Sequence, residues 1–499
     1  MDDVELANPL GSKKGKHKVS VFYWILMNLP PRFRSSLRSI QLLVIVSSDL
    51  LKQRGVDTFL RPFLEDMILL RKGVTLTVRG ETRIRHGMLL NFAGDIPASN
   101  HVAGFKEGVG FANLPCRTCM THKDHLDTVH HESQCIIRDK VSHELQVRQV
   151  ENPDETKVVR DALSSKFGVN RKCCLTALDY FDPTKCFMHD LMHVAHEGIL
   201  NSGTCLLLNN LILDESIKRR FNHDDVNYSI SILKSDREFT VPPPIRENEV
   251  FELSKLSFLS SAMASVAMCL GVVLGDFVNS DQYPHFAHFL LLLEIISSLQ
   301  CYSFTEEDLH VLECNIERDI SNHVLLYPKI SGAGSTISPK LHSLIHFANQ
   351  IRLLGPPRYA WCFRFESQNA PFKKIMRRNC NFHNVPRSLS THHQKLVGLN
   401  IRTDSEGDFF GMNDDVKLIC FSVDSTPLFM KHCRWANLLS ESSDFSKEAE
   451  INLLKKIKIA GRIFCVGKVF VCHLPVLNEC VHFMRISDIL ISLVQLVRQ

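Results

Sequence analysis

The densest group of metal-binding side chains in the sequence begins at Cys116. Cys116 and Cys119 form a Cys-x-x-Cys pair, a spacing that presents two thiolates to one zinc ion. His189 and His193 are four residues apart, so a helix would place both imidazoles on one face. Together the two pairs predict a Cys₂His₂ zinc site that ties two distant segments together, with His196 competing with His189 for a ligand position.

The same residues allow a simpler interpretation, which the spacing leaves open: two buried free thiols and a histidine-rich surface helix. Asp190 follows His189, so the segment is not the His-Glu-x-x-His motif of metalloproteases. The chain has 17 Cys, and apart from the Cys-x-x-Cys pair we interpret them as reduced, buried, small apolar residues.

Three carboxylates are candidates for metal-assisted chemistry. Asp95 follows a buried apolar run and precedes Ile-Pro, and Glu366 lies in the apolar and basic stretch WCFRFES. Asp3, with Asp2 beside it, lies near the start of the sequence. Carboxylates gathered in this way hold two divalent ions in phosphodiester chemistry. Spacing alone does not bring the three together, and each by itself is an ordinary surface carboxylate.

A basic cluster follows Glu366 within a few helical turns and consists of Lys373, Lys374, Arg377 and Arg378. Such a cluster suits contacts with a phosphate backbone, although a solvated charged face is the plainer interpretation. The whole chain is nearly neutral, with 58 Lys and Arg against 54 Asp and Glu and a formal charge of +4. Any contact with nucleic acid therefore has to come from local patches.

The elements that must position these residues are predicted to form a mixed α/β core. Apolar runs predict buried strands over 39–51 and 88–95, and a hairpin over 74–85 lies between them. Residues 56–73 have apolar positions at helical spacing and a glycine stop. A further helix is predicted over 363–376, after the turn GPPRY. Beyond residue 400 the runs 416–423 and 461–475 are strand-like and predict a small β domain.

The length of 499 residues predicts two to four domains. Two apolar runs, 257–278 and 286–299, predict a buried antiparallel helix pair and no transmembrane span. The first carries four Ser and reaches Asp276, and the second is too short and contains His288 and Glu294. The N-terminal stretch is acidic and then basic without an apolar core, so it is no signal peptide.

Taken in order, these motifs resemble the transposases of CACTA (En/Spm-type) DNA transposons, including their animal branch. Four blocks carry the resemblance and span nearly the whole chain. They are Asp2-Asp3 with Asn8-Pro9 and Gly11; Gly94-Asp95-Ile-Pro97 with Gly104-Phe105-Lys106 and Cys116-Arg-Thr-Cys119; His189-Asp190-Leu-Met192-His193 with Glu197-Gly198; and Trp361-Cys-Phe-Arg364-Phe365-Glu366 with Lys373-Lys374 and a downstream Asn381-Phe-His-Asn-Val385-Pro. The stretch PKLHSLIHFANQIRLLGPP, between the third and fourth blocks, also resembles the sequences of this family in its general pattern.

The resemblance implies an α/β fold: an RNase H-like mixed sheet core, interrupted by a large α-helical, zinc-stapled insertion and followed by a small C-terminal β domain. The implied boundaries are 1–110 for the first part of the core, 111–350 for the insertion, 351–400 for the helix with the third acid and the basic cluster, and 405–499 for the β domain. Asp3 (or Asp2), Asp95 and Glu366 would be the catalytic, metal-binding acids.

The implied activity is that of a DDE-type enzyme: cleavage and strand transfer at transposon DNA ends with Mg²⁺ or Mn²⁺, alongside a structural zinc ion. The implied partner is DNA, at transposon ends, and the implied location is the nucleus, or the cytoplasm if the protein is decayed. A homo-oligomer is compatible with this, and no small-molecule substrate or membrane is implied. Only one or two residues precede the first acid. We therefore expect an N-terminally truncated, weakly active or inactive transposase, or alternatively a non-catalytic zinc-stapled DNA- or protein-binding protein of transposon origin.

Overall fold

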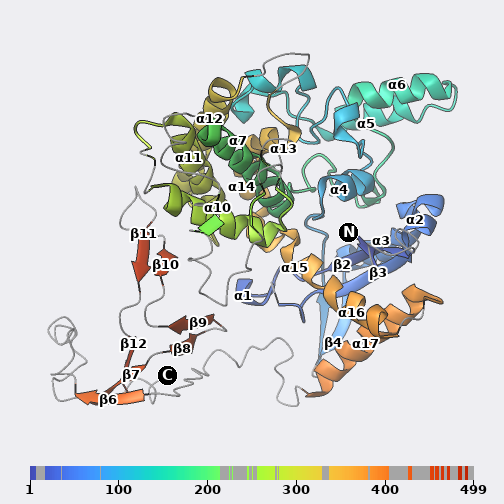
Figure 1. Ribbon diagram of the computed structural model, residues 1–499. Coiled ribbons are helices and arrows are strands. Elements are labelled where there is room, and N and C mark those ends of the chain that lie inside the picture. Colours follow the sequence, from blue (N-terminus) through green and yellow to red (C-terminus); the bar gives the residue numbers. More distant parts are fainter. Residues whose placement is uncertain are drawn as a thin grey trace. The chain divides into compact units, whose positions relative to one another are not determined.

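The computed structural model describes residues 1–6, 17–34, 36–78, 80–213, 256–275, 280–328, 336–379 and 382–403, a few positions between 224 and 278, and short strands after residue 424 (Figure 1). The chain divides into two compact units, Met1–Gly398 and Leu399–Gln499. The segments 1–110, 111–350 and 351–398 lie together in the first unit.

A three-stranded antiparallel sheet forms the start of the first unit. Its strands are β1 (Asp2–Glu5), β2 (Lys18–Trp24) and β3 (Gln41–Ser47), in the order β1-β2-β3. Successive side chains of a strand point to opposite faces, so β2 contributes to two separate cores. Phe22 packs in one of them, and Val19 and Val21 pack in the other.

Helices cover both faces of this sheet (Figure 1). On the Phe22 face lie α2 (Ser48–Arg54) and α3 (Val56–Lys72), whose residues Leu51, Leu60 and Leu64 share its core. On the opposite face lie α16 (Asn369–Asn379) and α17 (Val385–Thr403), which contribute Phe372, Met376 and Leu389. The two ends of the first unit's chain are thus packed around one sheet.

The predicted helix over 56–73 is confirmed as α3, which ends at Gly73 with a positive φ of 107°. The strand predicted over 39–51 is wrong in its last residues. Ser47 Oγ accepts a hydrogen bond from Leu50 N (3.2 Å) and caps α2, so the apolar residues after Ser47 are helical.

The predicted hairpin is confirmed by β4 (Val74–Val78) and β5 (Glu81–Arg85). The strand predicted over 88–95 is not formed. Phe92 makes only an isolated parallel bridge to Phe187, through a hydrogen bond from its N–H to Cys186 O (2.8 Å). The run was predicted to be buried, whereas most of its residues are only partly buried and Met88 is 55% exposed, and it has no continuous strand partner in the described residues.

Short helices and loops follow and carry the Cys-x-x-Cys pair. They are α4 (Ile96–Ala103), η1 (Val109–Phe111), η2 (Lys123–Thr128), η3 (Glu132–Gln134), α5 (Lys140–Val150), α6 (Lys157–Phe167), η4 (Cys174–Ala177) and the π-helical segment η5 (Met192–Ile199).

A helical region continues from η5 and contributes most of the largest hydrophobic core among the described residues. Its members are α7 (Leu200–Leu213), α10 (Ser260–Gly275), α11 (Pro284–Leu299), α12 (Glu306–Leu326), α13 (Pro339–His342), η7 (Ser343–His346), α14 (Phe347–Leu354) and η8 (Pro357–Tyr359). The predicted buried helix pair is confirmed as α10 and α11. Among the described helices, none has the length and apolarity needed to cross a membrane.

The helix predicted over 363–376 is divided into α15 (Cys362–Ser367) and α16. In the second unit the described strands are β6 (Ser425–Phe429), β7 (Glu450–Leu454), β8 (Lys456–Ile459), β9 (Arg462–Cys465), β10 (Val469–Cys472), β11 (His482–Arg485) and β12 (Ile489–Ser492). β9 and β10 fall in the run 461–475, whereas the run 416–423 lies outside the described residues. The observed class is mixed helix and sheet with small antiparallel sheets, which is compatible with the predicted α/β class.

Candidate functional site

Four buried side chains from two distant segments meet as a candidate metal centre. Cys116 and Cys119 come from the loop before η2, and His342 and His346 end α13 and η7. Cys116 Sγ lies 3.4 Å from His346 Nε2, and Cys119 Sγ lies 3.2 Å from His342 Nε2. All four ligand atoms lie within 4.8 Å of one another. Ligands of a tetrahedral zinc ion are roughly 3.3–3.8 Å apart, so this cluster can hold a metal ion.

Buried arginines shape the loop that carries the two thiols. The Arg138 guanidinium, in a residue only 1% exposed, donates to Cys116 O (2.9 Å) and to Cys119 O (3.1 Å). Arg117, inside the Cys-x-x-Cys pair, donates to Phe187 O (3.1 Å). A buried cation is costly unless its donors are used. Here the guanidinium of Arg138 holds the carbonyls of Cys116 and Cys119 in place.

A carboxylate behind the centre orients one imidazole. Glu132 Oε1 accepts from His346 Nδ1 (2.6 Å), which turns Nε2 of that ring towards Cys116. Asn349 Nδ2 donates to the other oxygen of Glu132. Metal-binding histidines generally donate their second ring nitrogen to a carboxylate, which fixes the tautomer and raises the basicity of the ligand. The His346–Glu132 pair follows this pattern.

Charge at the centre favours a thiolate at Cys116, whereas hydrogen bonds with Cys116 and Cys135 raise the pKa of Cys119. Burial by itself would raise the pKa of Cys116, but the hydrogen bond with Cys119 and the charge of His346 outweigh it and hold the pKa well below its usual value. Burial would lower the pKa of His346, yet the Cys116 thiolate and Glu132 raise it to about 10. A thiolate is the form that binds a metal ion.

The structure does not bring the predicted ligands His189 and His193 into this cluster. His189 lies beside it, stacked on His346 with ring centroids 6.0 Å apart and with Nε2 3.1 Å from Thr118 Oγ1. His193 belongs to another group of side chains, and His196 packs on Phe363 (ring centroids 5.3 Å).

Sequence reasoning therefore named the two thiols and missed their partners, His342 and His346. These two histidines have the same four-residue spacing as His189 and His193, in the stretch PKLHSLIHFANQ. From the spacing alone, either pair of histidines could have been proposed as the zinc ligands. Only the path of the chain decides which pair lies near the Cys-x-x-Cys loop.

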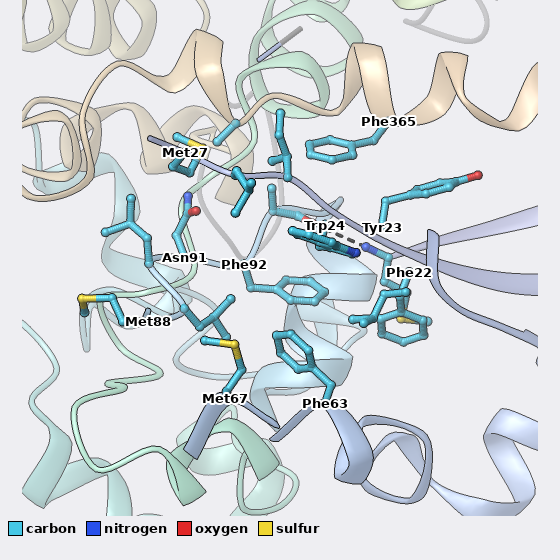
Figure 2. Close-up of a pocket in the computed structure, with 18 of the residues that line it drawn as sticks. Phe22, Tyr23, Trp24, Met27, Phe63, Met67, Met88, Asn91, Phe92 and Phe365 are labelled. Atoms are coloured by element: carbon cyan, nitrogen blue, oxygen red, sulfur yellow. Dashed lines mark hydrogen bonds between the residues drawn. The ribbon is translucent and has the colours of Figure 1, made fainter. Parts of the chain in front are cut away.

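A second candidate site is a cavity of about 820 Å³ lined by Asp2, Asp95 and Glu366. These acids come from β1, from the N-cap of α4 and from α15. Asp95 Oδ1 accepts from Ala98 N (2.6 Å) and caps α4. Figure 2 shows the apolar wall of the same cavity.

Of the two N-terminal acids, Asp2 lines the cavity and Asp3 does not. Neighbouring strand residues point to opposite faces, and Asp3 points towards α2. It accepts from Ser48 Oγ (3.2 Å), pairs with Lys18 Nζ (3.1 Å) and also accepts from Ser20. Burial alone would raise the pKa of Asp3, but Ser20 and Lys18 lower it. Of the two acids that the sequence left open, Asp2 is therefore the one at the cavity.

Glu366 is held by a chain of charges that begins with His193, which also lines the cavity. Asp190 Oδ2 accepts from His193 Nδ1 (2.7 Å), and His193 Nε2 lies 3.2 Å from Glu366 Oε1. Asp190 Oδ1 is itself fixed by Cys362 N (2.8 Å). Burial would lower the pKa of His193, but hydrogen bonds with Asp190, Cys362 and Glu366 raise it above its usual range. His193 is therefore an imidazolium between two carboxylates.

The predicted DNA-binding residues lie on the solvent face of α16. Phe372 and Met376 of this helix are buried against the sheet. The exposed positions are Lys373, Lys374, Arg377 and Arg378. The helix therefore presents a basic face a short distance along the chain from Glu366.

No model of a known protein family matches this chain, and no curated protein is similar to it.

Proposed function

We propose that the protein derives from a DDE-type DNA transposase of the CACTA kind, with an RNase H-like core that cleaves and joins DNA at transposon ends. The observation that carries the proposal is that Asp2, Asp95 and Glu366 line one cavity. These acids are far apart in the sequence. In metal-assisted phosphoryl transfer, carboxylates from separate elements converge on the divalent ions, and a shared cavity is the first condition for such convergence.

Two further features support an RNase H-like interpretation of the core. The antiparallel order β1-β2-β3, with helices on both faces, supplies a sheet whose first strand carries Asp2. The segment that leads to Asp95 runs beside the start of β1, where Met1 N lies 3.5 Å from Ala93 O. An acid in β1 is thus brought near an acid at the end of another extended segment.

Each group of residues has a separate role in the proposed reaction. Bound Mg²⁺ or Mn²⁺ would polarise the scissile phosphate and activate water or a 3′-hydroxyl. Asp2, Asp95 and Glu366 would bind the cations. Asp190 orients His193, and His193 in turn holds Glu366 at the cavity. The basic face of α16 would neutralise phosphates of the DNA.

In the same proposal the buried cluster of two Cys and two His binds a structural zinc ion. Two thiolates and two imidazoles form a donor set that zinc prefers, and all four are buried. The cluster ties the loop at Cys116 to the end of η7. A metal there would staple the two ends of the helical insertion together.

The test is a nicking assay on supercoiled plasmid DNA with purified zinc-loaded protein and added Mg²⁺ or Mn²⁺. Asp95→Asn keeps the cap of α4 because Asn also caps helices, and Glu366→Gln keeps an acceptor for His193. Both substitutions should abolish metal-dependent nicking. Glu65→Gln, at an exposed position of α3, is the matched control and should leave nicking unchanged. Equal nicking by all four proteins would contradict the assignment of the acids.

A second candidate is a non-catalytic, zinc-stapled DNA-binding protein of the same origin. It is favoured by the ion pair between Glu366 and His193, which sets a cation beside a proposed metal ligand. Asp2 also accepts from Asn369 Nδ2 (2.5 Å). DNA binding by the wild-type chain without nicking in either metal would select this candidate.

A further inference from the structure

Asp190, His193 and Cys362 form a second group of side chains with the donor atoms of a metal site, apart from the centre of two Cys and two His. One ligand atom of each residue lies within 4.8 Å of the ligand atoms of the other two. Asp190 and Cys362 are buried, and only 16% of the His193 side chain is exposed. The group is therefore largely shielded from water, unlike the acidic clusters that are common on protein surfaces.

Two elements that are far apart in the sequence bring this group together. Asp190 lies just before the π-helical segment η5, His193 lies in the first turn of that segment, and Cys362 begins α15. Asp190 Oδ1 accepts from Cys362 N (2.8 Å), and Asp190 Oδ2 accepts from His193 N (2.9 Å). Both carboxylate oxygens are thus fixed by backbone groups. π-Helical turns are frequent at functional sites, which agrees with such a fixed arrangement.

The imidazole of His193 is oriented in the manner of a metal-binding histidine. Its Nδ1 lies 2.7 Å from Asp190 Oδ2, and its Nε2 lies 3.2 Å from Glu366 Oε1. Histidines that bind a metal ion through one ring nitrogen generally donate the other to a carboxylate. With Nδ1 as the ligand atom, the Nε2–H group donates to Glu366. His346 and Glu132 show the same relation at the first centre, with the two ring nitrogens exchanged.

The donor atoms indicate which kind of ion the group binds. Thiolate and imidazole are ligands that Zn²⁺ prefers, whereas Mg²⁺ prefers oxygen ligands and keeps several waters. Three protein ligands leave one position of a tetrahedral zinc ion open. His193 and Cys362 both line the cavity, so a water molecule can reach that position from the cavity.

We propose that Asp190, His193 and Cys362 bind one Zn²⁺ ion, in addition to the ion proposed for the centre of two Cys and two His. Binding displaces two protons to solvent, one from Nδ1 of the His193 imidazolium and one from the thiol of Cys362. The ligand atoms then separate to the roughly 3.3–3.8 Å spacing of a tetrahedral ion. Glu366 keeps its hydrogen bond with His193 in both states, and this site does not depend on the proposed DNA chemistry.

The first experiment counts zinc per chain in purified, dialysed full-length protein by elemental mass spectrometry. Wild type should hold one ion more than Cys362→Ala, whether or not the centre of two Cys and two His is filled. Cys173→Ala is the matched control, because it removes a thiol that is equally buried in a different core. This control should hold as much zinc as the wild type.

Co²⁺ in place of Zn²⁺ identifies the ligand, because a thiolate bound to Co²⁺ gives a charge-transfer band in the near ultraviolet. The difference spectrum between the cobalt forms of wild type and Cys362→Ala should contain this band for one thiolate. The band should persist in excess Mg²⁺, since magnesium does not compete for a thiolate ligand.

A second variant answers the question even if the buried Cys362 is needed for folding. Asp190→Asn keeps an oxygen that accepts from Cys362 N but removes the charged ligand. Loss of a partner behind a ligand already weakens metal affinity 10- to 100-fold, so loss of the ligand itself should weaken zinc binding at this site by about 100-fold or more. Competition with a chromophoric chelator measures this change.

Three results would each overturn the proposal. One is equal zinc content in wild type and Cys362→Ala. Another is a cobalt difference spectrum without a thiolate band, or with a band that excess Mg²⁺ removes. The third is zinc affinity that Asp190→Asn leaves unchanged.

Discussion

The substitution Glu132→Gln tests the candidate metal centre without touching any of its four ligands. In the wild type Glu132 accepts a 2.6 Å hydrogen bond from His346 Nδ1, and the His346 ring is fully buried. Gln keeps an acceptor of nearly the same shape but loses the negative charge. The imidazole should therefore keep its orientation and become a weaker base, and hence a weaker ligand.

The expected size follows from this geometry. Changes to partners behind a metal ligand typically weaken metal affinity 10- to 100-fold. Because Gln preserves the hydrogen bond, we expect the lower end, about tenfold or about 1.4 kcal/mol. Removing the acceptor altogether with Glu132→Ala should approach the upper end, since Nδ1 would then be buried without a partner.

The assay is a competition for Zn²⁺ between the protein and a chromophoric chelator of known affinity at fixed pH. Glu155→Gln is the control, because Glu155 is exposed and its substitution removes the same charge. Identical zinc affinity in wild type, Glu132→Gln and Glu132→Ala would refute the reasoning. It would mean that His346 is not a ligand or that Glu132 does not act on it.

Three further outcomes are expected. Arg138→Lys should lower the free energy of unfolding by about 2–4 kcal/mol in denaturant titrations, because one ammonium cannot replace three guanidinium nitrogens that donate to several backbone carbonyls and to Gln146. Asp319 is 1% exposed, and burial raises its pKa from 3.8 to about 8, so it binds a proton in the folded state where the unfolded chain is ionised. Its contribution to stability is therefore lost as pH rises towards 8. In Asp319→Asn the free energy of unfolding, measured from pH 4 to pH 8, should not show this decrease. The decrease in the wild type amounts to at most about 4 kcal/mol at pH 7. Lys374→Ala should reduce the salt dependence of DNA binding, with the slope of log K against log salt falling by about 0.9 for a lost phosphate contact.

Apolar spacing and turn residues predicted some of the local elements. The apolar spacing and the glycine stop of 56–73 define α3, and hairpin residues define β4 and β5. The end of β3 was not predictable from hydrophobicity. Ser47 caps a helix there, and buried helix and strand segments share the same apolar composition.

The sites depend on contacts that no local pattern contains. The Cys-x-x-Cys pair was recognised because both thiols lie in one turn of chain. His342 and His346 are more than two hundred residues away, and a competing pair had the same spacing. The choice between Asp2 and Asp3 depends on the register of β1 against β2, since a shift of one residue exchanges the two faces.

The claim that Asp2, Asp95 and Glu366 surround a cation site is tested most directly by iron-mediated backbone cleavage. Fe²⁺ takes the place of Mg²⁺ in zinc-loaded protein, and ascorbate with peroxide then produces hydroxyl radicals that cut the chain beside the bound ion. We predict fragments, identified by mass spectrometry, from cuts next to Asp95 and Glu366, which excess Mg²⁺ suppresses and Asp95→Asn abolishes. Cleavage that avoids both positions, or that is insensitive to Mg²⁺, would contradict the proposed metal site.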